Sequence, residues 1–204
     1  IALQELLVHI SFLIITSIVN GLGLVASAGI GISEKLFVFL SIAPSAFMSA
    51  LSAFVAQNMG AGNPQRALRA MYVAQAISFA CGILTFSLTF FAGDFLASLF
   101  DGDPAVIQAT AQYMRGSGFE YLMIPLSFCF LGYFNGRERT AFVMIQGLAS
   151  AFLVRIPLSY YLSRLPGAGM FTISLAVPAA GLLSLGMCLA YFLHIRRGEP
   201  LPGK

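Results

Sequence analysis

Charged side chains are scarce in this chain. Asp, Glu, Lys and Arg make up only 9% of its 204 residues, and the formal net charge is +3. A soluble domain carries about 25% charged residues, so the composition excludes an ordinary soluble protein. The few basic residues are scattered and form no stripe, so we expect no nucleic-acid partner. Tryptophan is absent, which leaves tyrosine to mark any membrane interface.

The motifs of soluble enzymes are also missing. The chain contains no HExxH, no GxSxG, no phosphate-binding loop with its lysine and no complete GxGxxG. Cys81, Cys129 and Cys188 stand singly in apolar segments, without the CxxC or Cys/His spacing of a metal site. We therefore expect free buried thiols, no metal, no cofactor and no catalytic residues.

Long apolar segments fill the sequence instead. Hydrophobic residues make up 58% of it, and the mean hydropathy is +0.87. About 20 apolar residues in a helix cross the ~30 Å hydrocarbon layer of a membrane. We predict an all-α polytopic membrane helix bundle over residues 1–195, followed by a cytoplasmic tail at 196–204. Its six transmembrane helices are expected near Leu3–Val25, Leu36–Ala56, Leu68–Ala92, Phe119–Phe134, Thr140–Leu162 and Gly169–His194.

Turn and cap signals separate these segments. Asn63 and Asp103 each precede a proline, which predicts an N-cap followed by proline in the first helical turn. Pro104–Arg115 alternates apolar and polar residues at helical spacing and is interpreted as an outer extension of the fourth span, loosened at residues 116–118. Prolines inside the apolar runs are expected to kink their helices; these are Pro44, Pro125, Pro157 and Pro178.

Basic residues favour one end of the predicted bundle. Cytoplasmic loops of membrane proteins carry an excess of Lys and Arg. Seven basic residues fall at one end, namely Arg66, Arg69, Arg137, Arg139, Arg196, Arg197 and Lys204. The other end has three, Lys35, Arg115 and Arg164, together with the acidic Asp94, Asp101 and Asp103. This count places the tail and both basic turns in the cytoplasm.

Ionisable residues within the predicted spans are the main candidates for function, because each costs about 2.5–3.5 kcal/mol at mid-helix on insertion scales. Glu120 and Arg155 lie on consecutive antiparallel spans and are placed to pair. The pair has two interpretations. Either it is a structural pin between helices, or Glu120 exchanges its arginine for a proton or a cation.

The first span carries a second candidate pair. Glu5 and His9 are one helical turn apart on one face, so they either are solvated near the cytoplasmic end or face a cavity. Neutral polar residues such as Asn20 and Gln146 are expected to form interhelical hydrogen bonds. The GxxxG spacing of Gly132 and Gly136 predicts a close helix approach. Further candidates for a substrate cavity are Gln4, Asn20, Tyr121 and Met123.

The polar hairpin QNMGAGNPQRA, Gln57–Ala67, lies between the second and third spans. Its motif residues are Gln57, Asn58, Gly60, Gly62 and Arg66. Gly60-Ala61-Gly62 lacks the following Lys-Ser/Thr of a phosphate loop, so we interpret it as a tight turn.

This hairpin, read as AFVAQNMGAGNPQRA from Ala53, resembles a loop of multidrug and toxic compound extrusion (MATE) transporters. Three further stretches resemble the same family: GLGLVASAGIGISEKL (Gly21–Leu36), FCFLGYFNGRERTAFVMIQG (Phe128–Gly147) and LVRIPLSYYLSRLP (Leu153–Pro166). Members of that family have about twelve helices in two related lobes. The resemblance implies that this chain is a C-terminal six-helix lobe whose N-terminal partner lobe is missing. The opening at Ile1 without an initiating Met leads to the same expectation.

The resemblance also implies an activity, which is export of amphipathic, often cationic, small molecules from a bacterial plasma membrane. Inward flow of H⁺ or Na⁺ drives this export by alternating access between the lobes. The proton-linked aspartate of the family belongs to the N-terminal lobe. Sodium-linked members use acidic residues that correspond to positions near Val8 and Ile124, which are not acidic here; Glu5 and Glu120 lie about one turn away.

Two alternatives to drug export stay open at the level of the sequence. The first is a lipid-linked oligosaccharide flippase of the same superfamily, which needs a cationic cavity, whereas Arg155 is the one arginine well inside a predicted span. The second is a non-transporting membrane module, either a scaffold or the remnant of a longer protein.

Overall fold

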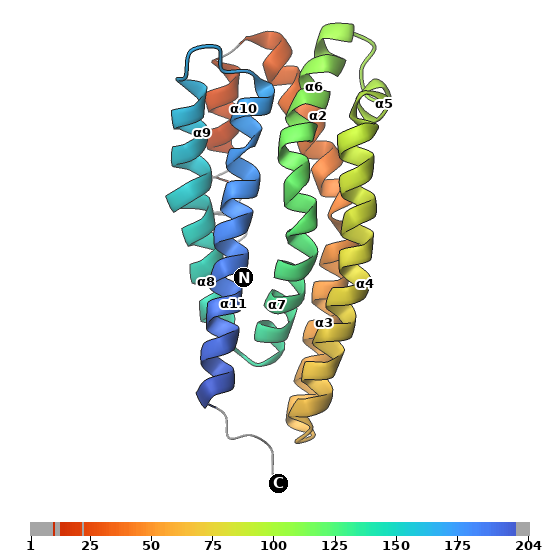
Figure 1. Cartoon of the computed structure of the whole chain (residues 1–204), viewed down its shortest axis with the longest axis vertical. Coiled ribbons are helices and arrows are strands. Elements are labelled where there is room, and N and C mark those ends of the chain that lie inside the picture. The colour runs from red at the N-terminus through yellow and green to blue at the C-terminus, as the bar shows by residue number, and fades with distance from the viewer. Residues whose placement is uncertain (1–9, 11–12, 22, 199–204) are drawn as a thin grey trace.

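The computed structural model describes residue 10, residues 13–21 and residues 23–198, and this part of the chain is almost entirely helical, with no strand (Figure 1). In chain order the elements are α2 (Leu24–Leu40), α3 (Ile42–Gly60), α4 (Pro64–Phe91), α5 (Gly93–Ser98), α6 (Pro104–Ser117), the 3₁₀ segment η1 (Gly118–Leu122), α7 (Ile124–Gly136), α8 (Thr140–Ala149), the π-helical segment η2 (Ser150–Arg155), α9 (Ile156–Ser163), α10 (Met170–Ser174) and α11 (Ala176–Gly198).

In the described part of the chain, four helical stretches are long and apolar enough to cross a membrane. They are Leu24–Gly60, Pro64–Phe91, Thr140–Ser163 and Met170–Arg197. Each contains most of one predicted span, and the predicted all-α membrane bundle is thereby confirmed. Ten residues of the predicted first span, 3–9, 11, 12 and 22, lie outside the described residues. Of its described residues, 10, 13–20 and 24–25 are helical.

The segment 26–35 differs from the prediction. It was expected to connect the first two spans, but it forms the body of α2 instead. Packing explains the difference, because α2 lies against α6: a Cβ on Gly29 would stand 3.1 Å from that of Ala109, and Ile32 and Leu36 share a buried cluster with residues of α6. The exposed Lys35 therefore lies within a helix rather than in a loop.

The fourth span is a composite of three elements. The predicted helical extension of the fourth span is confirmed as α6, and the helix changes to 3₁₀ winding at Gly118 before continuing as α7. Asp103 caps α6 as predicted, since its carboxylate accepts a hydrogen bond from the backbone N–H of Ala105 at 2.8 Å. Asn63 does not cap α4 in the same way. Asn63 is the N-cap residue of α4 and Pro64 is its first residue, as predicted, but the Asn63 side-chain amide donates to the carbonyl of Ala61 at 3.3 Å and makes no cap hydrogen bond.

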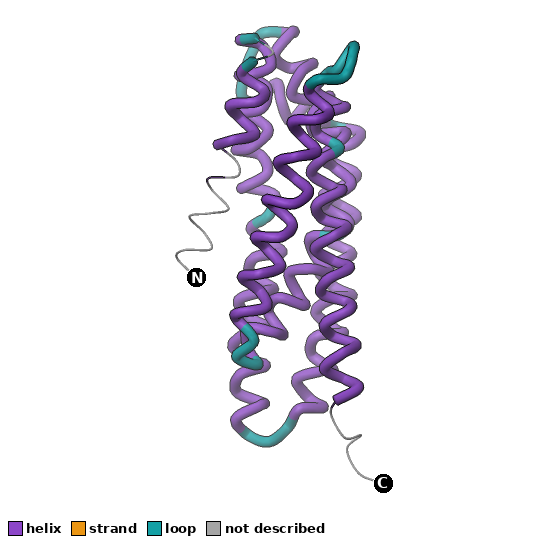
Figure 2. Tube along the Cα trace, turned by 90° about the vertical axis from the view of Figure 1, so that its left-hand side faces the viewer, coloured by secondary structure: helices purple, strands orange, loops and turns teal. Residues whose placement is uncertain are grey.

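The two ends of the bundle differ in their connections. The α3–α4 turn, the α7–α8 turn and the C-terminal end of α11 lie at one end, and the α5–α6 and α9–α10 connections lie at the other (Figure 1). The side view shows most turns gathered at these two ends (Figure 2). The basic turns near Arg66 and Arg137 therefore share an end with the basic end of α11, as the charge count predicted.

The core at the basic end is built where α7 packs on α3. A Cβ on Gly132 would stand 2.6 Å from the backbone oxygen of Met48, and one on Gly136 would stand 2.6 Å from the backbone oxygen of Ser52. The predicted close approach at this GxxxG sequence is thus confirmed. Around it, Phe130, Phe134 and Phe192 join a buried apolar cluster.

Candidate functional site

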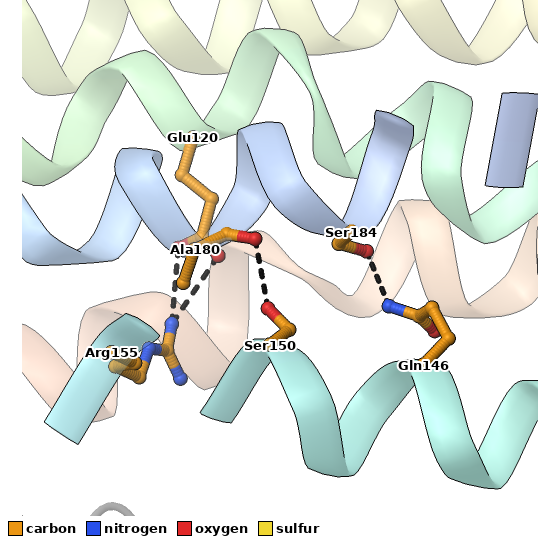
Figure 3. Close-up of polar contacts among 6 residues, drawn as sticks. All are labelled: Glu120, Gln146, Ser150, Arg155, Ala180 and Ser184. Atoms are coloured by element: carbon orange, nitrogen blue, oxygen red, sulfur yellow. Dashed lines mark hydrogen bonds and ion pairs between the residues drawn. The ribbon is translucent and has the colours of Figure 1, made fainter. Parts of the chain in front are cut away.

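A buried ion pair lies between the fourth span and the helix that follows it. The guanidinium of Arg155 donates to both carboxylate oxygens of Glu120, at 3.2 Å and 3.4 Å (Figure 3). Both residues are only 8% exposed. The predicted contact between these two residues is confirmed. Removing an ion pair from water costs several kcal/mol per charge, so the fold holds these groups at a cost that hydrogen bonding must offset.

Both members of the pair lie on helical segments with irregular winding. Glu120 belongs to η1 and Arg155 is the last residue of η2. Each segment is followed closely by a proline, Pro125 in α7 and Pro157 in α9. Proline has no N–H to donate to the carbonyl four residues earlier, so regular α-helical bonding ends before it. The predicted disturbance at these prolines takes the form of a change in winding.

The π-helical segment determines the direction of Arg155. Gln146 and Ser150 are one turn apart on the same face, and Arg155 follows Ser150 by five residues. Five residues of regular α-helix turn about 500°, which would leave Arg155 about 140° from Ser150. The i→i+5 bonding of η2 turns the helix less per residue, which reduces the angle between Arg155 and Ser150. Arg155 therefore lies on the side of the helix that faces the bundle interior.

A cavity of about 640 Å³ adjoins the ion pair, between α7 on one side and α8, η2 and α11 on the other. Its wall is mainly apolar, and Glu120 and Arg155 are among the residues that line it. The other polar side chains in the wall are Ser127, Asn135, Thr140, Gln146, Ser150 and Ser184. Such a cavity, apolar with a few convergent polar groups, is typical of a small-molecule site.

Hydrogen bonds across the cavity wall join η2 and α8 to α11 (Figure 3). The Gln146 amide donates to the Ser184 hydroxyl at 2.5 Å, which confirms the predicted interhelical bond, and the Ser150 hydroxyl donates to the carbonyl of Ala180 at 2.8 Å. Two buried acceptors in the wall, Gln146 Oε1 and Ser127 Oγ, have no hydrogen-bond partner among the described residues. A buried polar atom without a partner is costly, so the cavity offers these atoms to a bound polar group.

The remaining predicted cavity residues are not brought together. Tyr121 is buried and packs on Phe37 with 6.1 Å between ring centroids, and Met123 lies beside Gly181; neither lines the cavity. Asn20 is exposed and accepts a hydrogen bond from Ser27. Gln4, Glu5 and His9 lie outside the described residues.

The hairpin motif residues form a compact turn at the basic end. The side-chain amide of buried Asn58 donates to the carbonyl of Phe54 at 2.7 Å. The backbone carbonyl of Asn58 accepts from the backbone N–H of Asn63 at 2.8 Å. Gly62 has φ +72°, a left-handed conformation that favours glycine. Arg66 lies over the Phe54 ring at 5.5 Å. Gln57 and Gly60 are exposed.

Sequence reasoning missed Ser127, Ser150 and Ser184 as part of the site. Serines are common in membrane helices and often bond to a carbonyl of their own helix, so a lone serine carries little signal. The i, i+4 spacing of Gln146 and Ser150 was the available clue, since it places both on one face.

The family model described as MatE matches residues 1–161. The chain belongs to the MatE family. A relative from Shewanella oneidensis, named "FAD transporter", is 33% identical over 178 residues, which is 86% of this chain and 38% of that protein. The "Probable multidrug resistance protein YpnP" of Bacillus subtilis is 25% identical over 97% of this chain and 43% of that protein.

Two solved structures share the fold at low sequence identity. A MOP superfamily transporter from Pyrococcus furiosus, described as having a binding pocket of reverse polarity, matches with a TM-score of 0.85 and 17% identity, over 95% of this chain and 42% of that one. An inward-facing multidrug resistance MATE family transporter matches with a TM-score of 0.74 and 15% identity, over 96% and 44%. The chain thus spans less than half the length of these relatives and solved structures, and it is part of a membrane transporter fold.

Proposed function

We propose that this chain is the C-terminal six-helix lobe of a secondary active exporter of amphipathic, often cationic, small molecules in a bacterial plasma membrane. An N-terminal six-helix lobe completes the transporter, and the C-terminal tail and the α3–α4 hairpin face the cytoplasm. The observation that carries the proposal is the cavity of about 640 Å³ with a buried ion pair in its wall. Membership of the MatE family supports it.

The ion pair supplies the proposed coupling. H⁺ or Na⁺ binds Glu120 in place of the Arg155 guanidinium, and the exchange changes how η1 and η2 are held together. Only the differential affinity of the two conformations for the ion can shift the equilibrium between them. The Glu120–Arg155 pair bridges two irregularly wound segments, so a conformation that keeps the pair and one that breaks it differ in their affinity for the ion. Glu5 and His9 remain further candidates, outside the described residues.

A vesicle assay tests the proposal. The full-length transporter that carries this chain is placed in everted membrane vesicles with a proton gradient, acid inside, and a fluorescent cationic dye is added. Exchange of dye for H⁺ should raise the lumen pH, and a preset outward Na⁺ gradient tests the sodium alternative. Failure to move any dye under either gradient would contradict cation export.

A second candidate, export of a flavin dinucleotide, is favoured by two observations. The relative at 33% identity is named a FAD transporter, and Arg155 is a basic side chain in the cavity wall that an anionic substrate can approach. The same vesicles, offered FAD instead of dye, separate the two candidates. Uptake of FAD without dye movement would favour the flavin substrate, and the reverse would favour the organic cation.

A further inference from the structure

A second hollow lies on the exposed side of α3 and α4, and it shares no residue with the cavity. It is a groove of about 480 Å³. The wall on α3 consists of Phe47, Ala50, Leu51 and Phe54, and the wall on α4 consists of Arg66, Arg69, Ala70, Val73, Ala74 and Ile77. Eight of these ten residues are apolar, and the two arginines are the polar ones.

The order of these residues along α4 separates charge from apolar surface. Arg66 and Arg69 lie three residues apart on one helix face, next to the turn at the basic end. From Arg69 to Ile77 the apolar wall runs eight residues, about 12 Å at 1.5 Å per residue. One leaflet contributes about 15 Å of a ~30 Å hydrocarbon layer, so the groove matches the depth of a single leaflet.

The positive charge of Arg66 and Arg69 has no acidic residue beside it on α3 or α4. No acidic residue occurs between Glu34 and Asp94 in the sequence, and no ion pair joins Arg66 or Arg69 to a carboxylate of the described residues. Both arginines are exposed, and Arg66 lies in the first turn of α4, where the helix dipole disfavours cations. An anion at the mouth of the groove would offset both effects.

We propose that this groove binds an anionic phospholipid. The phosphate lies between Arg66 and Arg69, and an acyl chain lies along the apolar wall toward Ile77. Basic pockets between transmembrane helices bind anionic lipid head groups in this way, and the alanines at 50, 70 and 74 leave space between the bulkier side chains. The site is separate from the transport cavity and does not depend on the proposed function.

Native mass spectrometry of the purified full-length transporter tests this site, with phosphatidylglycerol and phosphatidylcholine as probes. The wild type should retain phosphatidylglycerol in preference to phosphatidylcholine. Arg66→Gln combined with Arg69→Gln should weaken phosphatidylglycerol binding roughly tenfold or more, since each basic residue near the surface contributes to anionic lipid binding. The matched control is Arg137→Gln with Arg139→Gln, which removes two charges at the same end but outside the groove and should leave binding close to wild type.

Three outcomes would overturn the proposal. The first is equal retention of the two lipids by the wild type. The second is an equal loss in both double variants, which would show a general attraction of the basic end. The third is unchanged phosphatidylglycerol binding in the groove variant, which is also the result expected if the other lobe of the transporter covers this face.

Discussion

Among the described residues, Glu120 and Arg155 are the charged side chains that the bundle holds away from solvent. Their spacing on consecutive spans was enough to predict the contact. The sequence did not reveal the surrounding serines or the winding that aims Arg155 inward, because both depend on which faces of the helices meet. At the scale of single residues, the contact between the two charged side chains was therefore predictable, whereas the directions of the side chains around it were not.

A double-mutant cycle tests the ion pair. Glu120→Gln and Arg155→Leu should each destabilise the protein by about 3 kcal/mol, because each leaves a buried charge without its partner. The double variant should cost less than the sum of the two. Thermal unfolding in detergent measures the effect. The exposed pair of Arg115 and Asp94 is the control, and its Arg115→Leu and Asp94→Asn cycle should show a coupling below about 1 kcal/mol. Additive losses at Glu120 and Arg155 would contradict the pairing.

A substitution of Gln146 distinguishes a role of this side chain in transport from a role in folding. Gln146→Leu removes the bond to Ser184 together with the unpartnered Oε1, so we expect a change in stability within about 1 kcal/mol but a clear loss of dye or FAD transport. Gln75→Leu on α4, outside the cavity wall, is the matched control and should keep transport. Normal transport by Gln146→Leu would show that this amide is not used by the substrate.

At the scale of helices, hydropathy located most spans because a membrane helix must be apolar on nearly all sides. It failed at 26–35, where glycines, serines, Glu34 and Lys35 resemble a connector. That segment is helical because its small side chains allow close contact with α6, and Glu34 accepts a hydrogen bond from Thr16 at 2.8 Å. A pattern of single residues does not report such partners.

Gly132 gives a test of the α3–α7 contact. Gly132→Ala should destabilise the bundle by more than about 1 kcal/mol, since the added Cβ would stand 2.6 Å from the backbone oxygen of Met48. Gly186→Ala is the control: nothing lies within 4 Å of its added Cβ, and alanine favours a helix over glycine. Unfolding temperatures of the two variants in the same detergent should differ. Equal temperatures would mean that the helices have room to separate.

At the scale of the whole chain, the distribution of basic residues predicts which end faces the cytoplasm. The structure places the basic turns and the C-terminal end of α11 at one end of the bundle (Figure 1), but sidedness in the membrane is still a prediction. It follows from the energetics of insertion and not from packing, so no contact within the bundle reports it.

Cysteine labelling measures the sidedness. In a variant without Cys81, Cys129 and Cys188, Ala61→Cys in the α3–α4 turn should react with an impermeant thiol reagent in inside-out vesicles but not in right-side-out ones. Gly102→Cys, in the turn before α6, should give the opposite pattern. Labelling of Ala61→Cys from the outside would reverse the proposed orientation.

The π-helical segment at 150–155 has a consequence for the evolution of this helix. Wider winding takes up one residue more than regular helix over the same rise, so a codon lost here restores α-helical winding and leaves the faces of α8 and α9 in phase. A codon lost in the middle of α4 would instead rotate everything after it by about 100°. Length variation among homologous chains is therefore expected to concentrate at η2, where Arg155 would then follow Ser150 by four α-helical residues, a turn of about 400°, and keep nearly the same direction.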